Sequence, residues 1–414
     1  MVFQWVQEYT EACVSDDVDC VTSLFEFISK RVRAGRRISL SAESDREDVL
    51  REMALELRTK PEAVSSFVKE WMDQKDDPNG IILDTPAPVP CTPSSSSVSS
   101  SVHPLLSWDT PHLGFTLTEL VSRSYQIFPH VLPTFSELVD GPVFSKFVKS
   151  VSHRYRGENR YHNFHHAHSV LAITGNLLTS CVPNLYTPIE EFAILTAALC
   201  HDIGHRGLNS DFYIKTRHSL AEEYNDISVL ENMHCSLSFE LIRANGFAKA
   251  WPDETYVQYR KVFIQSILAT DMKSHFDLTG KLMELSNEVC PTGSETGRKT
   301  IYCAIVHAAD LSNSVMPTAA SYDWAYRVVE EMHAQGKLEA AAQVAVTPFM
   351  KHPPSDTAEF VNLQLSFIAF IVSPLWKAMA ALWPTQLADR LKQLETNTQF
   401  WEQLKEDPEK NRKP

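Results

Sequence analysis

The stretch "LCHDIGHRGLN" (residues 199–209) places two imidazoles and a carboxylate, His201, Asp202 and His205, close together directly after the apolar run "FAILTAALC". Histidines four residues apart lie on one face of a helix, so His201 and His205 can point the same way. Such a pair can bind a metal ion, but structural roles and helix capping also account for many such pairs. Taken alone, the stretch leaves both interpretations open.

A second stretch, "RYHNFHHAHSV" (residues 160–170), is rich in histidine: it holds His162, His165, His166 and His168. His162 and His166 are again four residues apart, so one could bind a metal ion while the other faces a substrate. His165 and His168 would then point elsewhere, and we interpret them as exposed or hydrogen-bonded side chains.

A third stretch, "VHAADLSN" (residues 306–313), brings Asp310 to the end of a run of small and apolar residues. A buried carboxylate without a partner is costly, so this aspartate needs a cation or several hydrogen-bond donors. Capping of the next segment is the alternative for this residue.

The three stretches together supply a mixed nitrogen and oxygen ligand set suited to a borderline metal such as zinc. Asp202 or Asp310 could also bridge to a second, harder ion such as magnesium or manganese, which prefers oxygen ligands. Two such ions side by side activate a water and stabilise a phosphoryl group during displacement. The predicted ligands are His166, His201, Asp202 and Asp310.

Composition narrows the function further. The net charge of -14 argues against a nucleic-acid polymer as partner, because a phosphate-binding surface needs a basic stripe. The eight cysteines lack regular spacing, which favours reduced thiols in a cytoplasmic protein. We expect no transmembrane segment, since no apolar run reaches the roughly 18 residues needed, and no secretory signal, since the first residues soon turn acidic.

The elements that must position these residues are helical. Residues 108–414 show apolar side chains at i, i+3 and i+4 almost throughout, as in "TIYCAIVHAADL", which predicts an all-α domain. Gly246 is a good C-cap for the helix before it. Residues 84–107 are rich in Pro and Ser and are predicted to be a linker. Residues 1–83 form a predicted small helical segment, equally compatible with a homodimerisation or docking element and with a mere extension.

Six motifs occur in a fixed order: "YHNFHHA", "HDIGHRGLN", "YNDISVLENMH", "LATDM", "HAADLSN" and "LQLSFI". Over roughly residues 108–410 they resemble the catalytic domain of class I cyclic-nucleotide phosphodiesterases, in the HD-domain superfamily. The resemblance implies a compact multi-helix HD-type domain that hydrolyses a 3′,5′-cyclic nucleotide to the 5′-monophosphate. It also implies two divalent ions, zinc and magnesium (or manganese), and a role in ending cyclic-nucleotide signalling.

The resemblance also implies roles for individual residues. His166, His201, Asp202 and Asp310 match the zinc ligands, with Asp202 bridging to magnesium. His162 matches the general acid that protonates the departing O3′, a task for a group that titrates near neutrality. His205, Glu231 and Thr270 match the residues around the magnesium-bound waters.

The same resemblance implies a nucleotide pocket. Gln364 matches the glutamine that binds the purine, and Val328 and Phe367 match the apolar clamp on its faces. Without the resemblance, Val328 and Phe367 would be assigned to the core. Asn313 favours cAMP as the main substrate, with cGMP left open, since cAMP-selective members often carry Asn there. The remaining pocket-lining matches are Tyr161 and Met272.

Departures from the family pattern and alternative functions complete the prediction. Many family members carry Asp where this chain has Gly204, and Met332 replaces a more usual aromatic at the clamp. One alternative is another HD-superfamily phosphohydrolase, such as one acting on deoxynucleoside triphosphates, which would need a Lys/Arg cluster. The other is a catalytically silent module that binds cyclic nucleotide.

Overall fold

The computed structural model describes residues 103–406, and every regular element in this range is a helix, which confirms the all-α prediction. The segment predicted for residues 1–83, and most of the predicted linker, lie outside the described residues. By their internal contacts, the described residues form a small unit, residues 210–225 and 333–351, and a large unit that contains the rest.

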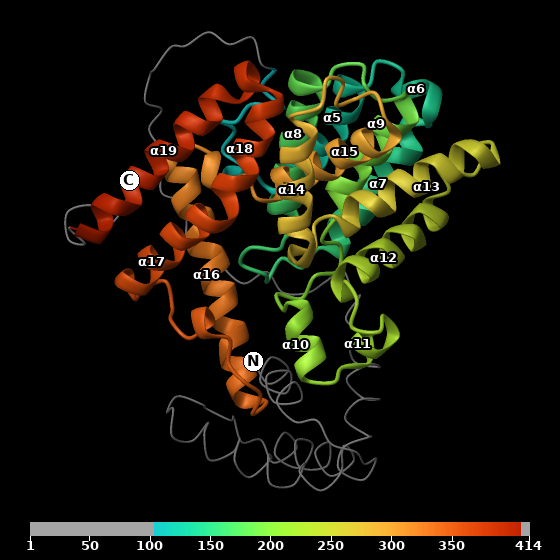
Figure 1. The fold of residues 1–414 in the computed structure, drawn as a ribbon. Coiled ribbons are helices and arrows are strands. Elements are labelled where there is room, and N and C mark those ends of the chain that lie inside the picture. Colours follow the sequence, from blue (N-terminus) through green and yellow to red (C-terminus); the bar gives the residue numbers. More distant parts are fainter. Residues whose placement is uncertain (1–102, 407–414) are drawn as a thin grey trace, which may run out of the picture. The chain divides into compact units, whose positions relative to one another are not determined.

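The large unit is organised around α8 (Phe164–Cys181), which is buried along almost its whole length. It packs against α5 (Leu117–Val131), α9 (Pro188–Cys200) and α15 (Glu295–Asp310), as Figure 1 shows. Helix α13 (Asp253–Leu268) packs on the other side of α9. Helices α8 and α9 are buried nearly all round, as helices at the centre of a core are.

Among the described residues, seven further elements of the large unit precede residue 318. They are η1 (His112–Gly114), α6 (Phe135–Leu138), α7 (Gly141–Arg154), α12 (Val229–Asn245), η2 (Met272–Ser274), α14 (His275–Leu285) and η3 (Ser312–Val315). Helix α12 ends at Gly246, whose φ of 72° is left-handed, as the predicted C-cap requires. The small unit holds α10 (Ser210–Lys215), α11 (Ser219–Glu223) and η4 (Pro348–Met350), and α16 (Thr318–Ala341) contributes residues to both units.

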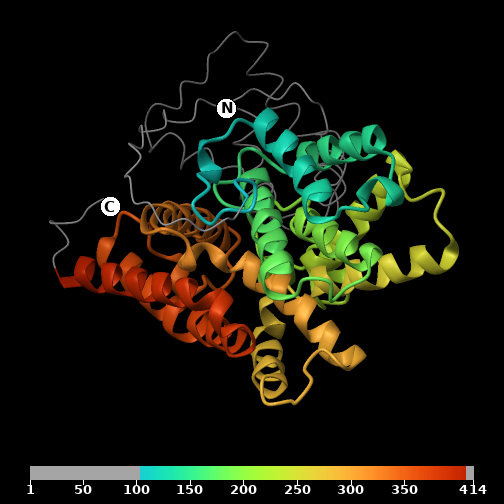
Figure 2. The same cartoon turned by 90° about the horizontal axis from the view of Figure 1, so that it is seen from above.

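The C-terminal helices α17 (Thr357–Phe367), α18 (Ser373–Leu382) and α19 (Pro384–Glu406) pack together, in red in Figures 1 and 2. A π-helical turn, η5 (Ile368–Val372), joins α17 to α18. The continuous helical stretch Thr357–Leu382 is long and apolar enough, by length and composition alone, to cross a membrane. Our expectation about apolar length was therefore wrong, although contacts with α14 and α19 are typical of a core helix.

Caps determine where the two histidine-bearing helices begin. The Asn163 side chain accepts hydrogen bonds from the backbone N–H groups of His165 (2.9 Å) and His166 (3.4 Å) at the start of α8. Helix α9 begins with Thr187 and Pro188, and Glu190 accepts a hydrogen bond from the Thr187 backbone N–H (2.9 Å). These local signals place histidines at the N-terminus of α8 and at the C-terminus of α9.

The last residues of the predicted linker contact the core. Leu105 and Leu106 are buried in the core, and the Asn176 side chain donates a hydrogen bond to the Leu106 carbonyl oxygen (2.9 Å). Burial of apolar area outweighs the composition of the preceding Pro/Ser-rich stretch at these two residues. The core-forming part of the chain therefore begins before residue 108.

Candidate metal centre and active site

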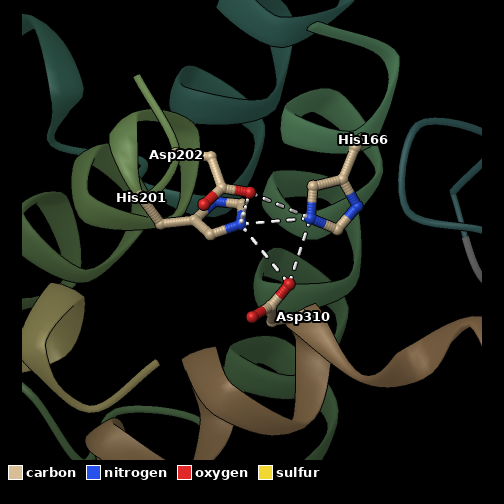
Figure 3. A group of neighbouring side chains, drawn as sticks. All are labelled: His166, His201, Asp202 and Asp310. Carbon is tan, nitrogen blue, oxygen red and sulfur yellow. Dashed lines mark hydrogen bonds and ion pairs between the residues drawn. The ribbon is translucent and has the colours of Figure 1, made fainter. Parts of the chain in front are cut away.

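Four predicted ligands meet at one point, as Figure 3 shows. His166 lies in the first turn of α8, Asp310 ends α15, and His201 and Asp202 follow α9. The His166 Nε2 atom is 3.2 Å from His201 Nε2 and 3.0 Å from Asp310 Oδ1. Asp202 Oδ2 lies 3.1 Å from His201 Nε2 and 3.4 Å from His166 Nε2. A tetrahedral ion with bonds of about 2.0–2.1 Å needs ligand separations of about 3.3 Å, so the cluster fits a divalent ion.

We call His166, His201, Asp202 and Asp310 the ion cluster. The charges within the ion cluster also favour a bound cation. His201 Nδ1 donates to the Ala198 carbonyl oxygen (2.9 Å), which leaves the Nε2 lone pair directed at the cluster. Burial lowers the pKa of His201, but the carboxylates of Asp202 and Asp310 outweigh it and raise that pKa well above its ordinary value. The cluster therefore attracts positive charge strongly.

The two oxygens of Asp202 face different neighbours. Oδ2 belongs to the ion cluster, whereas Oδ1 lies 3.6 Å from His234 Nε2. His234 Nδ1 donates to the Ile203 carbonyl oxygen (2.7 Å), and burial lowers the pKa of His234 to about 4. Neutral His234 thus presents an unprotonated Nε2 to Asp202 Oδ1, an arrangement that leaves this oxygen available to a second cation. The sequence analysis missed His234, although it lies within the motif "YNDISVLENMH".

His162, the predicted general acid, is held by a carboxylate that the sequence analysis also missed. Its Nδ1 hydrogen-bonds to Glu331 Oε1. Glu331 Oε2 accepts hydrogen bonds from the backbone N–H groups of Tyr161 (2.8 Å) and His162 (3.2 Å). Burial lowers the pKa of His162, but the Glu331 and Asp202 carboxylates raise it more, to about 9. His162 is therefore protonated at neutral pH, as an acid must be.

His205 lies against His162 in the opposite charge state. The two rings stack with their centroids 3.9 Å apart. Burial and the positive charge of His162 lower the pKa of His205 to about 3, and its Nδ1 accepts a hydrogen bond from the Gly207 N–H (2.9 Å). The Asn159 side chain donates to the carbonyl oxygens of both histidines (2.8 and 2.9 Å) and so ties the two segments together.

The predicted residues Glu231 and Thr270 lie in α12 and in the turn between α13 and η2. Burial and the adjacent Asp271 raise the pKa of Glu231 to about 8, and Asp202 contributes to this shift. The Glu231 Oε2 atom is buried and has no hydrogen-bond partner among the described residues. The Thr270 hydroxyl donates to the Ile267 carbonyl oxygen (2.8 Å), which leaves its lone pairs as acceptors.

The predicted pocket residues lie on several elements, and two of them lie beside the ion cluster. Asn313 Nδ2 donates to the Tyr161 hydroxyl (2.5 Å), and the Tyr161 ring centroid is 4.6 Å from that of His166, so both lie beside the ion cluster. Gln364 on α17 is buried, and within residues 103–406 its amide has no hydrogen bond. Val328 and Phe367 are partly buried against the core. Met272, which is 43% exposed, begins η2.

The backbone at Gly204 explains why this chain lacks the aspartate that many family members carry at this position. Its φ is 77°, and a Cβ atom there would lie 2.4 Å from Leu237 Cδ1. The left-handed backbone and the close side chain both favour glycine, so an aspartate at this position would be strained.

Fold and site together define an all-helical protein of the class that binds divalent metal ions through histidine and aspartate. The family described as 3′5′-cyclic nucleotide phosphodiesterase matches residues 161–394, a range that contains every predicted site residue. The chain belongs to this family.

Several named relatives are similar to the chain. The 3′,5′-cyclic-nucleotide phosphodiesterase regA of Dictyostelium discoideum is 35% identical over 57% of this chain and 30% of its own length. The mouse high affinity cGMP-specific 3′,5′-cyclic phosphodiesterase 9A is 30% identical over 63% of this chain and 48% of its own length. The chain thus spans less than half the length of these relatives. The crystal structure of the phosphodiesterase domain of the RhoPDE fusion protein from Salpingoeca rosetta is 30% identical, with a TM-score of 0.70, over 75% of this chain and 97% of that domain.

Proposed function

We propose that this protein hydrolyses 3′,5′-cyclic nucleotides to 5′-monophosphates, with cAMP as the main substrate, and so ends cyclic-nucleotide signalling. The observation that carries the proposal is the position of His162, which is hydrogen-bonded to Glu331 and held beside a cluster of two histidines and two aspartates that fits a divalent ion. Family membership supports the same reaction.

The ion cluster suits zinc, because it combines imidazole nitrogens with carboxylate oxygens at tetrahedral separations. Asp202 Oδ1, a carboxylate oxygen, is the kind of ligand that magnesium or manganese prefers, and it could hold the second ion. When bound, the two ions would supply Lewis acidity that activates a water and neutralises charge on the phosphoryl group.

The side chains of this protein would handle the departing oxygen. The water oxygen would form the new bond to phosphorus and release its proton to solvent, the bond from phosphorus to O3′ would break, and His162 would donate its Nε2 proton to O3′ and regain one from solvent afterwards. Glu331 holds the Nδ1 side of the ring and keeps it charged until transfer. His205, neutral and stacked on the same ring, adds no competing positive charge.

Base recognition would depend on Gln364, Asn313 and the apolar side chains of Val328 and Phe367. The Gln364 amide has no hydrogen bond among the described residues, so it can turn to offer a donor or an acceptor to either purine. Asn313 Nδ2 is engaged by Tyr161, which leaves Oδ1 to accept from the adenine amino group. These two features support cAMP as the main substrate with cGMP also hydrolysed.

The test is hydrolysis by the purified full chain with Zn²⁺ and Mg²⁺. We expect 5′-AMP from cAMP, slower formation of 5′-GMP from cGMP, and no product above background from a His201→Ala variant. A panel of deoxynucleoside triphosphates serves as the comparison. Turnover of those compounds without turnover of cyclic nucleotides would contradict the proposal, and so would tight binding of cAMP without hydrolysis.

We also propose a cytoplasmic location and the division into an N-terminal segment, a linker and a catalytic domain. Four of the five cysteines in residues 103–406 are buried free thiols, which supports a reducing compartment. A chain starting at residue 103 should retain cyclic-nucleotide hydrolysis. If residues 1–83 form a homodimerisation element, only the full chain should elute as a dimer in size-exclusion chromatography.

A further inference from the structure

A groove outside the candidate active site lies between α12 and α13, which run side by side in Figure 1. Its volume is about 260 Å³. The apolar floor is made by Cys235, Phe239 and Ile264, and the polar lining includes Ser236, Arg243 and Arg260. No residue assigned to the ion cluster or the nucleotide pocket lines this arginine groove, so it needs its own explanation.

The charge in the groove is unbalanced. No carboxylate lines it, and neither Arg243 nor Arg260 has an ion pair or a hydrogen bond with any residue in 103–406. Acidic partners are plentiful in a chain with a net charge of -14, and other arginines use them, as in the Arg298–Glu190 pair (2.6 Å). Both arginines are exposed, so water screens the repulsion between their charges, and an anion bound between them would neutralise what remains of it.

Arg260 is already positioned for such an anion. Its guanidinium lies over the Phe239 ring, 4.3 Å from the centroid. This stacking covers a face of the guanidinium and leaves the N–H edges free, which is the geometry that binds the oxygens of a phosphate.

The rest of the groove supplies complementary polar atoms. The Ser236 hydroxyl is exposed and has no hydrogen bond with another described residue. Asn232, which also lines the groove, donates both Nδ2 hydrogens to the carbonyl oxygens of Ile227 (2.9 Å) and Ser228 (3.1 Å). Its Oδ1 atom therefore remains free to accept a hydrogen bond. Asn232 lies near the N-terminal end of α12, and Arg243 lies near the C-terminal end.

We propose that the arginine groove binds a small phosphorylated ligand. The phosphate lies between Arg243 and Arg260, an apolar ring or chain lies on the floor, and a hydroxyl or amino group donates to Asn232 Oδ1. A nucleoside monophosphate has all three features and is the probe of choice.

The test is calorimetric titration of the full chain with AMP, in excess chelator so that divalent ions do not contribute. The double variant Arg243→Gln/Arg260→Gln should bind AMP at least ~10-fold more weakly, since hydrogen bonds to charged groups are the strong ones. The matched control Lys146→Gln/Lys249→Gln removes the same charge from exposed positions outside the groove and should bind like the unchanged chain. Equal weakening in both double variants, or no binding by the unchanged chain, would overturn the proposal.

Two further measurements test where AMP binds and which parts of it contribute to binding. Arginine Nε–H signals assigned to Arg243 and Arg260 should shift in ¹H–¹⁵N spectra as AMP is added, and unshifted signals would refute binding in the groove. Inorganic phosphate should bind more weakly than AMP, whereas equal affinity would refute the role of the apolar floor. Because no turnover is measured, failure here is independent of failure of the proposed hydrolysis.

Discussion

The ion cluster and the base-recognition residues are built in different ways. The ligand atoms of His166, His201 and Asp310 lie within 3.4 Å of one another, and hydrogen bonds to the backbone orient the imidazole of His201. Gln364, by contrast, is buried but has no hydrogen bond among residues 103–406, and Phe367 is only partly buried. The ligand atoms of the cluster thus lie close together and a backbone hydrogen bond orients His201, whereas the Gln364 amide can adjust.

Loss of a cluster ligand should have the largest effect. In His166→Ala the bound metal should fall, and kcat/KM for cAMP should drop by at least ~10⁴-fold, because several kcal/mol of transition-state stabilisation disappear. The measurement is metal content by mass spectrometry together with steady-state kinetics. His165→Ala is the matched control, since its ring bonds instead to the Phe115 carbonyl oxygen (3.0 Å). Retention of metal and activity in His166→Ala would contradict the cluster.

Loss of the general acid should be the next largest effect. His162→Ala should lower kcat by ~10²–10⁴-fold while the metal content stays unchanged, because His162 lies outside the four-ligand cluster. Kinetics and metal content are again measured on the same samples. If metal were lost with activity, His162 would be a ligand and its assignment as the acid would be wrong.

Glu331 should act through the pKa of His162. Because this pKa is raised to about 9, the protonated acid persists as pH rises through 6.5 and is lost only near pH 9. Glu331→Gln removes the carboxylate that raises it, so the alkaline limb of kcat/KM should move to lower pH and the rate at pH 8 should fall by ~10–100-fold. A pH profile with an unmoved alkaline limb would show that Glu331 has only a structural role.

Substitutions of the residues that would bind the purine base should have the smallest effects on catalysis. Phe367→Ala should raise KM for cAMP by ~10-fold, the equivalent of an aromatic contact, with kcat little changed. Gln364→Ala should weaken the binding of cAMP and of cGMP by similar factors, since the free amide favours neither purine. Competition assays with both substrates provide the measurement. A strong shift of the cAMP/cGMP ratio in Gln364→Ala would show that the amide is held after all.

Much of the fold and of the ion cluster could be predicted because the signals are local. Apolar spacing predicted the helices, Gly246 marked the end of α12, and ordered motifs pointed to the four ligands. Contacts that form only through tertiary packing leave no such local pattern in the sequence. Glu331 is 169 residues from His162, and no spacing rule connects them. The burial of Leu105 beside a Pro/Ser-rich stretch was hidden by the composition of its neighbours.

The sequence by itself determined the helices, the ligand types and the family, because each depends on residue identities over short stretches. Only the tertiary structure decided which atoms meet. Burial lowers the pKa of His162, but the carboxylates of Glu331 and Asp202 outweigh it and raise this pKa to about 9, whereas burial and the charge of His162 lower the pKa of the adjacent His205 to about 3. Packing of α12 against α13 likewise brings Arg243 and Arg260 to one groove without a carboxylate. Charge state and proximity depend on desolvation and on neighbours distant in the chain, which no local pattern encodes.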